Sequence, residues 1–91
     1  MIRVQVKESA LRDLRKLDPT IAQKVYDKLD HLQQHPEPHK WLQKVEGTAS
    51  NLYRLHVGRD WVVIGELEGN IFYVIMVEHR SKVYQNVKRS Q

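Results

Sequence analysis

Three consecutive apolar stretches separated by short turns fill most of the second half of the chain. They span residues 52–57, 61–67 and 71–78, and the turns at 58–60 and 68–70 each contain a glycine. Strands joined by short glycine-containing turns pair as antiparallel hairpins. The third stretch is apolar at nearly every position, which predicts an interior strand covered on both faces for much of its length. The chain must therefore fold around a β-meander.

The first half of the chain predicts one strand and two helices that back this meander. Residues 2–6 alternate between apolar and polar side chains, as in a strand with one buried face. Leucines then recur at helical spacing after Ser9, where we expect a first helix to begin. Asp18 and Pro19 end that helix and supply the N-cap and first position of a second one, which ends by Pro36. The two helices should form an antiparallel hairpin.

The remaining segments complete an α+β fold. Residues 35–50 contain two prolines and a turn-forming run, so we expect an irregular loop that Trp41, Leu42 and Val45 attach to the edge of the core. Residues 80–89 predict a short C-terminal helix. The expected architecture is a single domain over residues 1–91, with the helical hairpin packed on a mainly antiparallel four-stranded sheet.

Composition limits the possible functions. The chain has no cysteine, which excludes disulfides and thiolate metal sites. A net charge of +4 permits a polyanionic or an acidic protein partner, and the last twelve positions carry four basic residues and no acid. No apolar run is long enough for a membrane span and no signal peptide is visible, so we expect a cytoplasmic protein without membrane contact.

Polar side chains near the meander suggest a site for phosphate. On the first meander strand, Arg54 and His56 should point away from the core, beside Arg59 in the next turn. Arg80 follows the third strand, and Tyr84 lies four residues later. Arginine binds phosphate through a planar fork, and histidine transfers protons near neutral pH, so these residue types suit metal-free RNA cleavage. A solvated polar face of a basic protein is the alternative interpretation.

Other conspicuous residues have structural interpretations. His31, His35 and His39 are spaced by four, but Pro36 ends the helix before His39, and there is no HExxH motif. We therefore expect no metal site and no cofactor. Trp41 and Trp61 are expected to pack at the boundary of the core.

The order of these elements and several motifs resemble the RelE/ParE superfamily of type II toxins. The segment LYRLHVGRDWVVI is similar to the family's central hairpin and HRSKVY to its C-terminal motif; ALRDLRKLDP and KWLQKVEG also fit. The resemblance implies a small toxin held inactive by an antitoxin, which represses its own operon as a complex. RelE-like members cleave mRNA on the ribosome without a metal, whereas ParE-like members poison DNA gyrase. The VY ending of the motif points to the RelE side.

The resemblance assigns roles to individual positions and implies a ribosome-dependent, metal-independent endoribonuclease (an mRNA interferase). Its partners would be a RelB/ParD-like antitoxin, the ribosome and mRNA, with operator DNA bound only through the antitoxin. Val62 stands where the family commonly has arginine. It motivates the alternative of a gyrase inhibitor or a catalytically weak, antitoxin-binding co-repressor. The implied catalytic residues are Arg54, His56, Arg80 and Tyr84, and the implied RNA- or phosphate-binding residues are Arg59, His79, Lys82 and Lys88.

Overall fold

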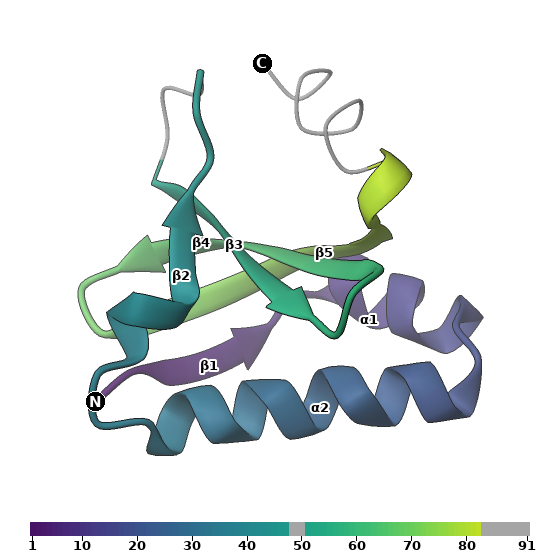
Figure 1. Ribbon diagram of the computed structural model, residues 1–91, viewed down its shortest axis with the longest axis horizontal. Helices are drawn as coiled ribbons and strands as arrows, with labels where there is room; N and C mark the ends of the chain where they lie inside the picture. Colours follow the sequence, from purple (N-terminus) through teal and green to yellow (C-terminus); the bar gives the residue numbers. More distant parts are fainter. Residues whose placement is uncertain (48–50, 83–91) are drawn as a thin grey trace.

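The chain forms a mixed β-sheet with two helices on one of its faces (Figure 1). The computed structural model describes residues 1–47 and 51–82. A helical turn at residues 80–82 is the described part of the predicted C-terminal helix. The α+β prediction is confirmed. In chain order the elements are β1 (Arg3–Val6), α1 (Glu8–Lys16), α2 (Pro19–Gln34), the 3-10 helix η1 (Pro38–Trp41), β2 (Leu42–Lys44), β3 (Leu52–Val57), β4 (Trp61–Glu68) and β5 (Ile71–His79).

The sheet has five strands in the order β1-β5-β4-β3-β2, one more than the sequence predicted. Strands β3, β4 and β5 form the predicted antiparallel meander, and β1 pairs in parallel with β5. The additional strand, β2, lies inside the segment predicted as an irregular loop and pairs antiparallel with β3. Its three residues are too few to show a periodic pattern, so only its pairing with β3 defines it as a strand.

The helix boundaries follow local signals at one corner but not at the other. Asp18 caps α2, because its carboxylate accepts a hydrogen bond of 2.8 Å from the backbone N–H of Thr20, and Pro19 occupies the first helical position. Helix α1 begins at Glu8 and has no side-chain N-cap. Ser9, the predicted start, instead donates its hydroxyl to the carbonyl of Ile75 on β5. Ser9 therefore lies inside the first turn of α1 and makes a contact distant in the sequence instead of capping the helix.

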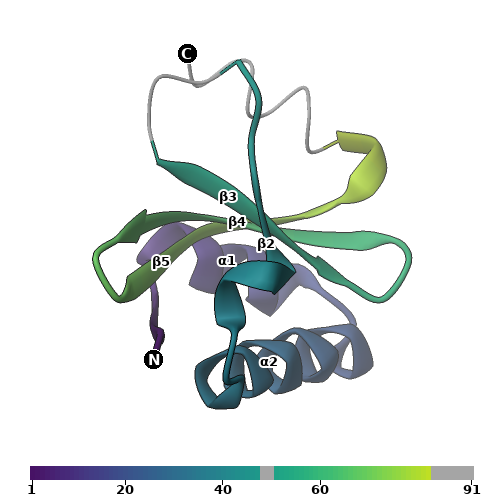
Figure 2. The same ribbon diagram turned by 60° about the vertical axis from the view of Figure 1, so that its left-hand side comes forward.

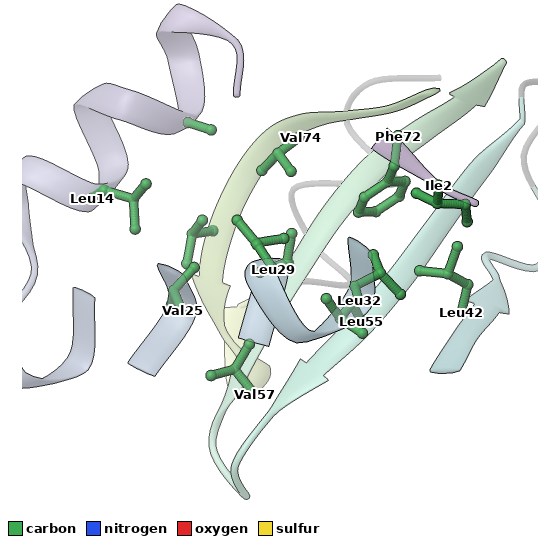
Figure 3. Close-up of a cluster of buried hydrophobic side chains, with 13 residues drawn as sticks. Ile2, Leu14, Val25, Leu29, Leu32, Leu42, Leu55, Val57, Phe72 and Val74 are labelled. Carbon is green, nitrogen blue, oxygen red and sulfur yellow. The ribbon is translucent and has the colours of Figure 1, made fainter. Parts of the chain in front are cut away.

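The main core lies between the helices and the sheet (Figure 3). Burying such apolar side chains is the principal force that holds the helices against the sheet. Figure 2 shows α1 and α2 on the same side of the sheet. The predicted attachment of the 35–50 segment is confirmed, since Leu42 belongs to this core and Trp41 packs against it. The core consists of Ile2, Ala10, Leu14, Val25, Leu29, Leu32, Leu42, Leu55, Val57, Val63, Phe72, Val74 and Val77.

Helix side chains complete the hydrogen bonding of the sheet where strands are missing. Strand β1 ends before the last residues of β5, and there the carboxylate of Asp13 on α1 accepts a bond of 3.0 Å from the N–H of Val77. On the outer edge of β1, the N–H of Val4 donates to Gln33 of α2 at 2.8 Å. Capping an edge in this way satisfies backbone groups and discourages pairing with another chain.

A bulge in the β4–β5 pairing depends on Gly65. The register shifts between Ile64 and Gly65. A Cβ atom at Gly65 would lie 2.6 Å from the carbonyl oxygen of Tyr73 and 2.7 Å from the ring of Phe72. Only glycine fits this close approach.

Candidate functional site

The predicted polar residues of β3 lie on the sheet face opposite the helices, hereafter the second face. Leu55 and Val57 of β3 belong to the main core, whereas His56 is exposed and Arg54 is half-buried. This alternation confirms the predicted orientation of the strand. Neither α1 nor α2 covers the second face (Figure 2). Arg54 and His56 therefore lie two residues apart on a surface that the helical layer leaves uncovered.

Arg54 is held by its neighbour on β2. The two strands pair Gln43 directly with Arg54, and the Nε of Arg54 donates to the Oε1 of Gln43 at 3.1 Å. A cross-strand hydrogen bond of this kind restricts the guanidinium without neutralising its charge. The unpredicted strand β2 thus positions one of the predicted site residues.

The floor of the second face is apolar. Val62 and Ile64 of β4 are each only 1% exposed. The register places Ile64 opposite Arg54 and Val62 opposite His56. Because Val62 replaces the arginine that the resemblance implies, the centre of this face has an aliphatic side chain and no charge. The second face carries a smaller apolar cluster of Val45, Leu52, Val62 and Ile64, with Ile75 and Met76 packed against it.

Arg80 lies at the end of the sheet nearest to His56. Its backbone N–H donates to the carbonyl of Asp60, in the β3–β4 turn, at 2.8 Å. Its Nε lies 3.8 Å from the Asp60 carboxylate, and both side chains are more than half exposed. An exposed pair at this distance contributes little to stability. The backbone of Arg80 is therefore held by a hydrogen bond, and its exposed guanidinium is readily available to an anionic ligand.

His79 and Lys82 lie elsewhere, beside α1. They line a hollow of about 240 Å³ together with Lys16, Leu17 and Trp61 among others. The rings of His79 and Trp61 meet edge to face at 5.4 Å, and Trp61 packs against the main core. The Nδ1 of His79 accepts the N–H of Ser81 at 3.3 Å. The structure thus separates these two residues from Arg54 and His56 and gives His79 packing and capping contacts.

The other predicted residues are not assembled on the second face. Arg59 lies in the β3–β4 turn and lines a separate hollow of about 120 Å³ with Ile21 and Lys24 of α2. Tyr84 and Lys88 lie outside the described residues. The structure therefore brings together Arg54 and His56, with Arg80 at the adjacent end of the sheet.

The register adds Glu78, which the sequence did not indicate as a site residue. Val62 pairs with His56 on one side and with Glu78 of β5 on the other. The three residues form one row across the second face, and Glu78 is half-buried. No short motif could have identified Glu78, because its relation to His56 depends on the pairing of three strands.

No cluster of three or more histidine, cysteine or acidic side chains is arranged to hold a metal ion in residues 1–47 and 51–82. His35 caps α2, accepts the N–H of Glu37 at 2.8 Å, and packs on Trp41. None of the described helices combines the length and apolarity needed to cross a membrane.

Solved structures of toxins share this fold. The RelBE2 complex from Mycobacterium tuberculosis matches with a TM-score of 0.75 and 21% identity, covering 87% of this chain and 98% of that chain. The archaeal RelE–RelB complex from Pyrococcus horikoshii OT3 matches with a TM-score of 0.67 and 24% identity, covering 89% and 97%. The isolated E. coli RelE toxin matches with a TM-score of 0.66 and 24% identity over 100% of both chains. The fold is RelE-like.

A family model matches residues 4–84, nearly the whole chain. Together with the fold, this match defines a type II toxin of the RelE/ParE superfamily. Within that superfamily the chain belongs to the family described as the ParE toxin of the type II toxin–antitoxin system parDE. The resemblance drawn from the sequence motifs is thus confirmed. A search of curated proteins finds no match.

Proposed function

We propose that this toxin stops translation by cleaving mRNA on the ribosome, without a metal ion, at the second face of its sheet. The observation that carries the proposal is the juxtaposition of Arg54 and His56 on that face, with Arg80 at the adjacent end. Two guanidinium groups suit the extra negative charge of a phosphorane, and an exposed imidazole suits proton transfer. The resemblance adds Tyr84 as a candidate base.

The reaction would be an internal transesterification. The 2′-oxygen of the ribose attacks the adjacent phosphorus, and the bond from phosphorus to the 5′-oxygen breaks. One group on the enzyme takes the proton of the 2′-hydroxyl, and another gives a proton to the departing 5′-oxygen. The products are a 2′,3′-cyclic phosphate and a 5′-hydroxyl end. The ribosome would hold the message so that one phosphate lies over Arg54 and His56.

The partner we propose is a RelB-like antitoxin in the same cytoplasm. Several of the similar solved structures are complexes with RelB. A bound antitoxin that covers the second face would block access of RNA. Contact with operator DNA would occur only through the antitoxin.

A second candidate function is inhibition of DNA gyrase. The family description and Val62, which puts an aliphatic side chain at the centre of the second face, favour this alternative. It requires no RNA chemistry at Arg54 or His56. The two functions therefore differ in what the Arg54 and His56 variants would do.

Mapping of mRNA ends by primer extension in a translating cell-free extract tests the proposal. We expect wild-type toxin to produce new ends within translated codons. Arg54→Ala should reduce the cleavage rate about 10²–10³-fold, since it removes one charged donor from the transition state. His56→Ala should reduce it about 10²–10⁴-fold. Arg12→Ala and His31→Ala, which change exposed residues of α1 and α2, are matched controls that should retain activity.

A gyrase supercoiling assay on the same proteins separates the alternatives. Intact mRNA together with inhibited supercoiling would show that the chain acts on gyrase and that the RNA proposal is wrong. Cleaved mRNA with normal supercoiling would support the proposal. Arg80→Ala and Tyr84→Phe belong in the same series, because full activity in both would remove these two residues from the mechanism.

A further inference from the structure

The row His56, Val62 and Glu78 places an imidazole and a carboxylate on either side of an aliphatic side chain. Val62 pairs with His56 of β3 and with Glu78 of β5, so the three Cα atoms lie across adjacent strands. Strands are about 4.8 Å apart, which puts the Cα atoms of His56 and Glu78 roughly 10 Å apart. Side chains extending from these positions can approach one another above Val62.

The orientation of Glu78 follows from its neighbours. Val77 belongs to the main core and His79 contacts Trp61 on the helix side. Strand alternation therefore directs Glu78 to the second face, as it does Val62, which belongs to the second-face cluster. Glu78 is half-buried and His56 is exposed, so a ligand can reach both.

The side chains of His56 and Glu78 are available for chemistry. Within residues 1–47 and 51–82, neither side chain takes part in a hydrogen bond or an ion pair. Charged groups at this end of the sheet include Arg54 on the same strand as His56, Arg80 from the segment after β5, and Asp60, whose carboxylate lies 3.8 Å from the Nε of Arg80. Glu78 also borders the hollow beside α1, whose charged residues are Asp13, Lys16 and Lys82. Val62 contributes no charge between His56 and Glu78.

We propose that Glu78 is the general base of the RNA cleavage and His56 the general acid. This inference rests on the proposed function and names a catalytic residue that neither the sequence motifs nor the family match assigns. The Glu78 carboxylate takes the proton from the 2′-hydroxyl as the 2′-oxygen bonds to phosphorus. The protonated His56 imidazole gives its proton to the 5′-oxygen as the bond from phosphorus to that oxygen breaks. Arg54 and Arg80 carry the charge of the phosphorane.

The arrangement provides an imidazole and a carboxylate, two kinds of group that general acid–base catalysis uses to give and to take a proton. An arginine at position 62 would stand between His56 and Glu78 and would pair with the carboxylate. Val62 is aliphatic and forms no ion pair with the carboxylate of Glu78, its partner on the next strand. The substitution that weakens an arginine-based mechanism is therefore compatible with one based on a carboxylate.

The test measures single-turnover cleavage of mRNA on programmed ribosomes by wild-type toxin and by Glu78→Gln, which keeps the shape of the side chain. We expect Glu78→Gln to cleave about 10²–10⁴-fold more slowly than wild type. Glu78→Asp should recover at least tenfold over Glu78→Gln. Glu66→Gln, on the neighbouring strand and also half-buried, is the matched control and should cleave at the wild-type rate.

Each remaining outcome overturns a definite part of the proposal. If Glu78→Gln cleaves like wild type while His56→Ala does not, Glu78 is not the base and the proposed function stands. If Tyr84→Phe is inactive and Glu78→Gln cleaves at the wild-type rate, the base is Tyr84. If wild-type toxin leaves mRNA intact, the proposed function fails and this inference fails with it. Circular dichroism and a thermal melt of each variant establish that it is folded, and Glu78→Ala, which also removes the carboxylate, replaces Glu78→Gln if the latter does not fold.

Discussion

The hydrogen bond from the N–H of Val77 to Asp13 should contribute strongly to holding α1 against β5. The bond is 3.0 Å long, joins residues 64 positions apart and is partly buried. It satisfies the edge of β5 where β1 has already ended, directly before Glu78 and the segment that carries Arg80. Replacing Asp13 by alanine leaves the N–H of Val77 without its acceptor at a position where the residue is buried.

The expected loss in free energy of unfolding follows from two opposing effects. A hydrogen bond to a charged acceptor contributes about 1.5–3 kcal/mol. Alanine is a better helix former than aspartate by up to about 0.7 kcal/mol. The net destabilisation by Asp13→Ala should therefore be about 1–2 kcal/mol. In a domain of 91 residues, this corresponds to a decrease in Tm of about 4–16 °C.

Thermal unfolding followed by circular dichroism measures this change, and amide hydrogen exchange at Val77 locates it. Asp13→Asn keeps an acceptor oxygen and should lose about half as much stability or less. Asp27→Ala, which removes an exposed helical aspartate that accepts a hydrogen bond from Gln23 within α2, is the matched control and should alter Tm by a few degrees at most. If Asp13→Ala has the same Tm as Asp27→Ala, or if amide exchange at Val77 is unchanged, the hydrogen bond between α1 and β5 is not what stabilises this end of the sheet.

Three further changes have defined outcomes. Gly65→Ala forces a methyl group against a backbone carbonyl and a phenylalanine ring, so a thermal melt should show a loss of about 1–3 kcal/mol. Gln33→Ala removes the acceptor of the Val4 N–H, which should lower stability by about 1 kcal/mol and speed amide exchange at Val4; unchanged exchange would contradict this. Asp60→Ala removes the exposed carboxylate beside Arg80 and should change the free energy of unfolding by less than about 1 kcal/mol. A larger loss would mean that the pair is more than a surface contact.

The fold was largely predictable because its main signals are local. The alternation of β3, the glycine turns around β4 and the Asp18–Pro19 corner depend on neighbouring residues, and the structure confirms each of them. Strand β2 was missed because three residues carry too little pattern to indicate a strand. Ser9 was expected to begin α1 but bonds across to β5 instead, a contact that no local signal encodes.

The candidate site was predicted in composition but not in arrangement. The motifs supplied Arg54, His56 and Arg80, which the structure places near one end of the second face. His79 and Lys82 were grouped with them in the sequence-based hypothesis and lie instead around the hollow beside α1. His79 ends β5 and Lys82 lies in the helical turn at residues 80–82, so their nearness in sequence to Arg80 did not determine their side of the sheet.

The sequence by itself determined the elements, the layer of helices behind a meander and the membership in the toxin superfamily, because periodicity, turn residues and short motifs are properties of neighbouring positions. The tertiary structure decided which side chains share a face. Parallel pairing of β1 with β5, the bulge at Gly65 and the alignment of His56, Val62 and Glu78 all arise from strand register. Register depends on contacts between distant segments that must be satisfied together, and a displacement by one residue would move every side chain of a strand to its other face.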